Sequence, residues 1–167
     1  MNLASVLNFF QVKIAYAHCD IPCGIYDPHN AQLAAHTIIR MTQLLGEVKP
    51  VRQAQGKRED ETKAEHDIAR ITHVKEEHAS LLENELTTLQ NDYFKEEHIK
   101  EYPSLPELFK NASRLGAKAR QGIDTDSAQK LLLVVQDIAE IFFKTKGVIP
   151  VRVKSVYPTG GEIVTYK

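Results

Sequence analysis

The stretch DTDSAQKLLLVVQDIAEIFFKTKG (residues 124–147) decides the fold class. Apolar residues recur in it at steps of three and four, as on one face of an α-helix: they are Leu131, Val134, Val135, Ile138, Ile141 and Phe142. Asp124, Thr125 and Asp126 offer N-terminal caps, and Gly147 is typical of a helix C-terminus. The stretch therefore predicts an amphipathic helix.

Three earlier segments show the same helical period. Residues 30–46 place Leu33, Thr37, Ile38, Met41, Leu44 and Leu45 on one face. After a polar loop (46–60), residues 59–91 carry Ile68, Ile71, Val74, His78, Leu81, Leu82, Leu86 and Leu89. A third helix begins near Pro106 and ends at Gly122, a pattern favoured by proline in a first turn. Four amphipathic helices with short to medium loops predict an all-α, up-down four-helix bundle.

The C-terminal tail (148–167) has a different period. Val151 and Val153, then Ile163 and Thr165, alternate on either side of Gly160-Gly161, which predicts a β-hairpin. A lone hairpin is marginally stable in water. We expect it to lean on the bundle, to lean on a neighbouring subunit, or to stay mobile.

Composition excludes several function classes. The 167 residues suit one domain, and 21 basic against 22 acidic residues give a net charge of −1, whereas electrostatic nucleic-acid binders are strongly basic. No apolar run approaches the roughly 20 residues of a membrane helix. Tryptophan is absent and aromatic residues make up 7%, which disfavours a base-stacking platform. We expect neither a nucleic acid nor a membrane as partner.

The segment HCDIPCGIYDP (residues 18–28) concentrates chemically reactive side chains. Pro22 restricts the preceding residue to an extended shape and Gly24 permits a positive φ. Together they allow a hook that turns Cys23 back towards Cys19 and His18. Thiolates with an imidazole select late first-row transition metals, and three ligands from one hook leave an open face suited to catalysis.

Other interpretations of Cys19 and Cys23 stay open at this point. Two cysteines at this spacing suit a disulfide, an isolated redox pair or half of a zinc site. Zinc would need a second ligand pair, and His66, His73 and His78 on the second helix have no cysteine beside them.

The whole segment resembles the nickel-binding hook of the nickel superoxide dismutases. The likeness is contiguous over residues 18–28 and extends in order to about residue 147. A second block is Asp92-Tyr93-Phe94-Lys95 with His98 and Tyr102-Pro103, and a weaker third block is Ile141–Lys146.

The resemblance implies a ligand set and a reaction. Nickel, one ion per subunit, would be held by the α-amine and imidazole of His18, the amide nitrogen and thiolate of Cys19, and the thiolate of Cys23. The enzyme would convert two superoxide anions to O2 and hydrogen peroxide by cycling between Ni(II) and Ni(III), as an antioxidant oxidoreductase. The His18 imidazole would be the axial ligand of the oxidised state.

The resemblance also assigns roles around the hook. Tyr26 would cover the open face and hold small anions or water, with Tyr93 as its hydrogen-bonding neighbour. Asp20 and Pro22 would help to fix the hook. Lys95 would lie near the entrance, where a positive field attracts superoxide, although an ordinary surface charge explains it equally well.

Two positions depart from the family pattern. Ala34 stands where family members carry a glutamate that supports the axial imidazole, and His78 stands where they carry an arginine. Partners of this kind orient a metal ligand. Backbone groups, His78 or water would then support His18. His78 is our candidate, and packing alone is the competing interpretation of that residue. The tail 148–167 extends beyond shorter family members.

Residues 1–17 admit three interpretations: a secretory signal, an ordinary helix, or a pro-segment. Ala15-Tyr16-Ala17 resembles a signal-peptidase site, but the only base, Lys13, comes late. We favour a pro-segment, because removal by a maturation protease would free the His18 amine. The predicted organisation is thus a pro-segment (1–17), a hook-and-bundle domain (18–147) and a tail (148–167), with a cytoplasmic location and export left open.

Two other functions are compatible with these sequence features. One is a non-enzymatic nickel carrier or sensor that uses the same hook. The other is a helical interaction protein with an incidental disulfide. The resemblance favours the enzyme and implies a homohexamer.

Overall fold

The computed structural model describes residues 24–48 and 58–167. The predicted pro-segment and much of the polar loop after the first helix lie outside these residues. The chain forms α2 (His29–Glu47), α3 (Arg58–Thr88), the π-helical turn η2 (Leu89–Tyr93), α4 (Glu96–Glu101), α5 (Leu105–Gln121) and α6 (Thr125–Thr145), followed by β1 (Pro150–Lys154) and β2 (Glu162–Tyr166). None of the helices in this part of the chain is long and apolar enough to cross a membrane.

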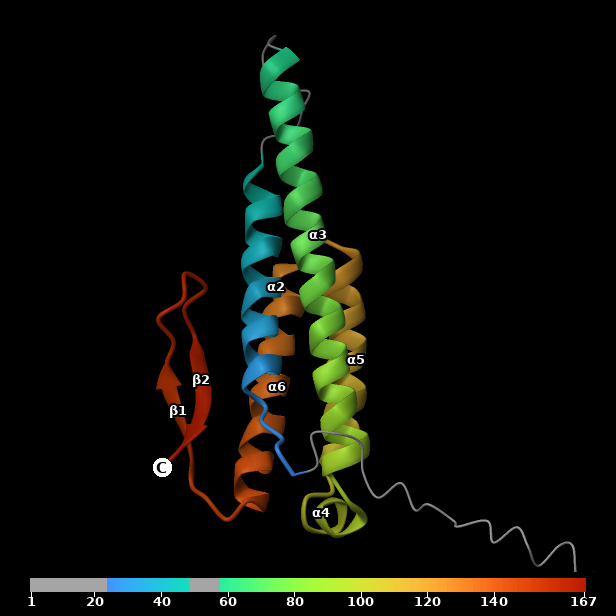
Figure 1. Ribbon diagram of the computed structural model, residues 1–167, viewed down its shortest axis with the longest axis vertical. Coiled ribbons are helices and arrows are strands. Elements are labelled where there is room, and N and C mark those ends of the chain that lie inside the picture. The colour runs from blue at the N-terminus through green and yellow to red at the C-terminus, as the bar shows by residue number, and fades with distance from the viewer. Residues whose placement is uncertain (1–23, 49–57) are drawn as a thin grey trace, which may run out of the picture.

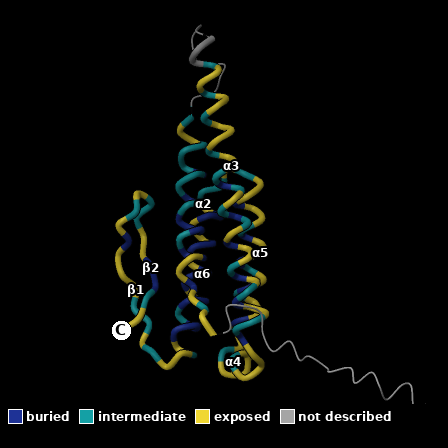
Figure 2. The backbone as a smooth tube through the Cα atoms, in the orientation of Figure 1, coloured by how far each residue is buried: buried dark blue, intermediate teal, exposed yellow. Residues whose placement is uncertain are grey.

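The predicted four-helix bundle is confirmed. Helices α2, α3, α5 and α6 pack side by side, and α2 and α3 extend beyond the other two at one end (Figure 1). The short α4 and the π-helical turn before it were not predicted; they close the opposite end. The buried positions follow the inner sides of the helices (Figure 2).

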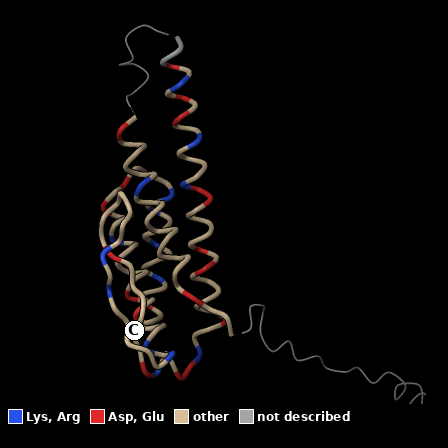
Figure 3. The backbone as a smooth tube through the Cα atoms, turned by 60° about the vertical axis from the view of Figure 1, so that its left-hand side comes forward, with Lys and Arg blue, Asp and Glu red and all other residues tan. Residues whose placement is uncertain are grey.

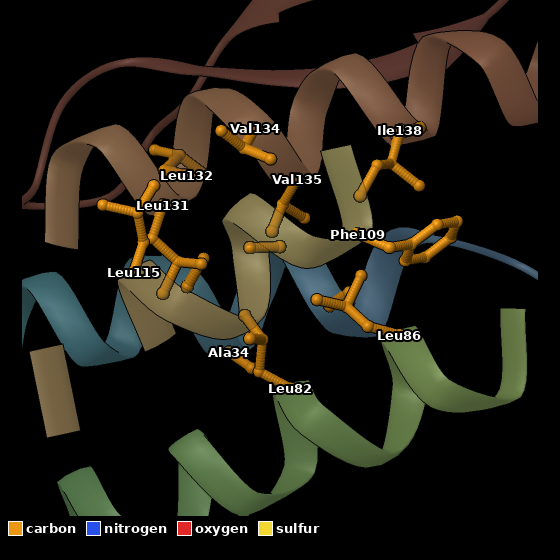
Figure 4. Close-up of a cluster of buried hydrophobic side chains, with 14 of the residues drawn as sticks. Ala34, Leu82, Leu86, Phe109, Leu115, Leu131, Leu132, Val134, Val135 and Ile138 are labelled. Carbon is orange, nitrogen blue, oxygen red and sulfur yellow. The ribbon is translucent and has the colours of Figure 1, made fainter. Parts of the chain in front are cut away.

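The core is built where all four long helices meet. Leu82 and Leu86 of α3 approach Phe109 of α5, while α2 contributes the small side chain of Ala34 (Figure 4). From α6 come Leu131, Leu132, Val134, Val135 and Ile138 (Figure 4). Each large side chain removed from water contributes about 1.5–3 kcal/mol.

The predicted helix ends agree well with the structure. Pro106 lies in the first turn of α5. The Asp124 carboxylate caps α6 by accepting a hydrogen bond of 2.9 Å from the backbone N–H of Ser127. Gly147 follows α6 with φ +75°, a conformation that glycine adopts without strain.

Parts of the predicted apolar faces were wrong. On α3, Ile68 and Leu81 are exposed (38% and 40%). Leu81 and Leu82 are about 100° apart around the helix, so both cannot face the core, and Leu82 takes that place. Lys75, which a helical pattern would assign to solvent, is buried and donates to the Gly122 carbonyl at the end of α5; burial lowers the pKa of this lysine.

The buried side of α2 also differs from the predicted face. Leu33, Thr37 and Met41 are only half-buried, whereas Gln32 and His36 are buried. The reason is a second covered side: the C-terminal hairpin packs against α2 and α6. A pattern of apolar residues does not detect a surface that is covered by polar contacts.

The hairpin confirms the predicted β structure, and of the three alternatives given for it the structure shows the first, contact with the bundle. β1 and β2 pair antiparallel with Arg152 opposite Val164, and β2 faces α6 and α2 (Figure 1). The Gln32 amide donates to the Val164 carbonyl (3.0 Å) and accepts from the Val164 N–H (2.7 Å). Gln136 and His36 both donate to the Glu162 carbonyl. Helix side chains therefore satisfy the outer edge of β2 in place of a third strand.

We expect Gln32→Ala to lower the free energy of unfolding by about 2–3 kcal/mol, because it leaves a buried N–H and a buried carbonyl of Val164 without partners. Chemical denaturation measures this. The control Gln129→Ala, on the exposed side of α6, should stay within about 0.5 kcal/mol of the original chain. Equal losses in the two variants would contradict the role of Gln32.

Candidate active site

The candidate site begins where α3 becomes a π-helix. In η2 the hydrogen bonds span five residues, and the Phe94 N–H donates to the Leu89 carbonyl over 2.9 Å. Such turns occur often at functional sites. Here the turn delivers Tyr93 and Phe94 in succession to the end of the bundle, and Phe94 is buried edge-on against Phe109 of α5 (centroids 5.7 Å apart).

Tyr93 is surrounded by rings from several segments. Its ring centroid lies 5.5 Å from Tyr26, which precedes α2, and 4.5 Å from Phe142 of α6. His98 of α4 stacks on it at 5.5 Å with an interplanar angle of 14°. Contacts of this kind add about 0.5–1.5 kcal/mol each beyond area burial. The cluster therefore fixes the Tyr93 ring from several directions.

The hydroxyl and the face of Tyr93 meet the last turn of α6. The Tyr93 hydroxyl lies 2.7 Å from the Thr145 hydroxyl oxygen. The Lys146 ammonium lies over the Tyr93 ring, 4.8 Å from its centroid. Burial raises the pKa of Tyr93 above its ordinary value of 10.0. Tyr93 is thus a neutral phenol at physiological pH.

The predicted metal ligands His18, Cys19 and Cys23, with Asp20 and Pro22, lie outside the described residues. Gly24 is described: it is exposed with φ +93°, a conformation that glycine permits. Within residues 24–48 and 58–167, no three His, Cys, Asp or Glu side chains are grouped so as to hold a metal ion. Two thiols and an imidazole in the preceding segment have the soft donor chemistry that fits nickel.

The structure brings together some of the predicted site residues. Tyr26 and Tyr93 are in contact, and Lys95 is exposed at the start of α4, next to the cluster in sequence. His78 is elsewhere on α3: fifteen residues at about 1.5 Å each put it roughly 20 Å from Tyr93. Its Nδ1–H donates to the Val74 carbonyl (2.9 Å), and Ala34 is fully buried in the core.

The sequence alone assigned no role to three residues of this cluster. His98, Thr145 and Lys146 lie in the two blocks that resemble the family, and that was the only available signal. Their spacing along the chain does not reveal that they converge on one phenol. Charges of both signs are interspersed along α3 (Figure 3). A single positive charge such as Lys146 is therefore distinguished by its position over the Tyr93 ring and not by a surrounding patch of one sign.

In this helical bundle two half-buried phenols are in contact, and one of them lies three residues after a His–Cys segment. This combination has the make-up of a metal-dependent oxidoreductase. Comparisons with known proteins define the class further. The sequence profile of the nickel-containing superoxide dismutases matches residues 13–146. The chain belongs to that family, and it is an oxidoreductase that uses nickel to dismutate superoxide.

Individual relatives agree. The Ni superoxide dismutase of Streptomyces seoulensis is 34% identical over 136 residues, covering 81% of this chain and 92% of the relative. That of Streptomyces coelicolor is 33% identical over 140 residues, covering 83% and 96%. A native nickel superoxide dismutase structure superposes with a TM-score of 0.64 at 30% identity, covering 78% of this chain and 99% of the other. These relatives give no support to the alternative of a non-enzymatic carrier.

We expect Tyr93 to ionise above pH 10, because burial disfavours the phenolate. The difference in tyrosinate absorbance between the original chain and Tyr93→Phe isolates this group. Since the unfolded phenol loses its proton first, the folded state holds more protons, and the free energy of unfolding should fall as pH rises past 10. This absorbance difference reports the ionisation of Tyr93. A midpoint at or below pH 10 would show that the Tyr93 hydroxyl is not shielded from water as described.

Proposed function

We propose that His18, Cys19 and Cys23 hold the nickel and that Tyr26 and Tyr93 form the wall of the active site beside it. The single observation that carries this is the contact between the two tyrosine rings, with centroids 5.5 Å apart. Tyr26 follows Cys23 by three residues in sequence. The phenol pair is therefore tied to the proposed hook by a short stretch of chain.

Bound nickel would supply one-electron redox chemistry between Ni(II) and Ni(III). The protein's contribution is to hold the anionic substrate and to exclude bulk water. Tyr26 covers the open face, and Tyr93, locked by its ring contacts, holds Tyr26 or a bound water in register. Asp20 and Pro22 stabilise the shape of the hook.

Positive charge at the entrance favours the approach of superoxide. Lys95 is exposed, and the Lys146 ammonium lies 4.8 Å from the centre of the Tyr93 ring. We assign both to electrostatic attraction of the substrate, with Lys146 the better placed of the two. A local field of this kind acts even on a protein of nearly zero net charge.

We assign the support of the His18 imidazole to His78, with one geometric requirement. Because His78 lies roughly 20 Å along the helix from Tyr93, a hook folded tightly beside Tyr26 is beyond its reach within one chain. His78 then acts on the hook of a neighbouring subunit, through the ring nitrogen Nε2, since Nδ1 is engaged by Val74. This arrangement suits the homohexamer that we propose.

Maturation is part of the same proposal. Removal of residues 1–17 converts the His18 nitrogen from a peptide amide into an amine, which is a metal ligand. We assign the cleavage to a maturation protease in the cytoplasm, supported by the late position of Lys13 in the N-terminal segment.

The decisive experiment replaces the thiols. In protein that begins at His18, Cys19→Ser and Cys23→Ser should each lower dismutation by more than about 100-fold, beyond the range for residues that only support a ligand, and should abolish the thiolate-to-nickel absorption. Oxygen donors stabilise Ni(III) less well than thiolates do. His29→Gln, an exposed histidine at the start of α2, is the control and should retain nickel and activity.

The full-length chain with residues 1–17 attached provides a second arm of this experiment. It should be inactive in excess nickel. Near-normal activity in either serine variant, or in the uncleaved chain, would show that the ligand assignment is wrong.

We expect Lys146→Gln and Lys95→Gln each to lower kcat/KM by about two- to threefold at low ionic strength, and the difference to shrink as salt is added. Lys130→Gln is the matched control, because Lys130 is exposed near the other end of α6 and pairs with Asp126. Pulse radiolysis at several salt concentrations measures the rates. A salt-independent loss would argue against electrostatic attraction.

A further inference from the structure

We infer that Thr145 is a positioning residue that fixes the direction of the Tyr93 hydroxyl, so that Tyr93 meets any other partner in the site only as a hydrogen-bond acceptor. The catalytic consequence rests on the proposed place of Tyr93 in the active site. The direction of the hydroxyl itself rests on the hydrogen bonds of the last turn of α6 alone.

The direction follows from a count of protons. The Thr145 hydroxyl oxygen lies 2.7 Å from the Phe142 carbonyl oxygen and 2.7 Å from the Tyr93 hydroxyl. A carbonyl only accepts, so the single Thr145 hydroxyl proton must point at Phe142. The short contact between Thr145 and Tyr93 then needs the proton of Tyr93. Tyr93 therefore donates to Thr145.

The opposite arrangement fails on the same distances. If Thr145 donated to Tyr93, the Thr145 and Phe142 oxygens would face each other at 2.7 Å with no proton between them. Back-bonding of a threonine hydroxyl to a carbonyl one turn earlier is a common local arrangement in helices. The Phe142 carbonyl also accepts from the backbone N–H of Lys146 (3.2 Å), which holds this acceptor in place at the helix end.

Two consequences follow for the site. The chain Tyr93–Thr145–Phe142 ends at a carbonyl, which passes no proton onward, so it polarises Tyr93 and is not a proton wire. With its own proton directed at Thr145, Tyr93 offers only lone pairs elsewhere. A water or the Tyr26 hydroxyl can donate to Tyr93, and the protons that convert superoxide to hydrogen peroxide reach the substrate by another route.

The test reads the hydroxyl directly. Off-resonance Raman spectra of the purified chain contain a tyrosine doublet whose intensity ratio separates phenols that donate from phenols that accept. Subtracting the spectrum of Tyr93→Phe from that of the original chain isolates the signal of Tyr93. For each Thr145 variant, the spectrum subtracted is that of the double variant that also carries Tyr93→Phe. The original chain and Thr145→Ser should give a donor-type ratio, and Thr145→Val, which keeps the branched shape without the hydroxyl, should lose it.

Turnover is measured on the same variants, prepared as nickel-loaded protein that begins at His18. We expect Thr145→Val to lower it about tenfold, the small end of the range for residues that orient a metal site, and Thr145→Ser to restore most of the loss. Circular dichroism and thermal unfolding check that each variant is folded.

Three outcomes would overturn the inference. An acceptor-type ratio in the original chain, or an unchanged ratio in Thr145→Val, would show that the hydroxyl direction is wrong. Unchanged turnover in a Thr145→Val protein with an altered ratio would show that the direction has no catalytic role. The Raman outcomes do not depend on the nickel ligands, whose assignment is tested separately by the cysteine variants.

Discussion

The burial of α6 on more than one side is the constraint on which the rest of the structure depends. Twelve of its residues are buried, and a helix that is apolar over most of its surface must be covered on most of its surface. Helices α2 and α5 cover one part. The hairpin covers another, where Tyr166 packs on Phe143 (centroids 5.1 Å apart) and Gly161 approaches Leu132.

Covering a helix with a hairpin creates a second requirement, because one edge of β2 is then taken out of water. Buried backbone groups need partners, and no third strand is present among the described residues. Gln32, His36 and Gln136 supply those partners from α2 and α6. On the other strand, Arg152 pairs with Asp137 and Glu140 of α6. The hairpin is thus held by polar contacts at its edges and by apolar contacts at its face.

The C-terminal end of α6 links this packing to the proposed chemistry. Phe142 belongs to the core and also touches the Tyr93 ring, while Thr145 and Lys146 follow it directly. Because α6 is fixed along its length, its last turn is a rigid support for the phenol. The sequence match to the family ends at residue 146, so the hairpin that packs on α6 lies outside the matched region.

Much of this protein could be predicted from its sequence, and for a physical reason. Helix period, caps and the alternation around Gly160-Gly161 are local properties, so four helices and a hairpin were predictable. The resemblance of residues 18–28 to a nickel hook identified the chemistry, since the proposed donor residues lie close together in the chain. Which apolar residues face inward on α2 and α3 was less predictable, because that depends on neighbours. The pairing of Gln32 with Val164, and the meeting of Tyr26, Tyr93 and Thr145, join residues 132, 67 and 52 positions apart. Only the tertiary structure decides such contacts, because they depend on how whole helices pack and not on the preferences of any one segment.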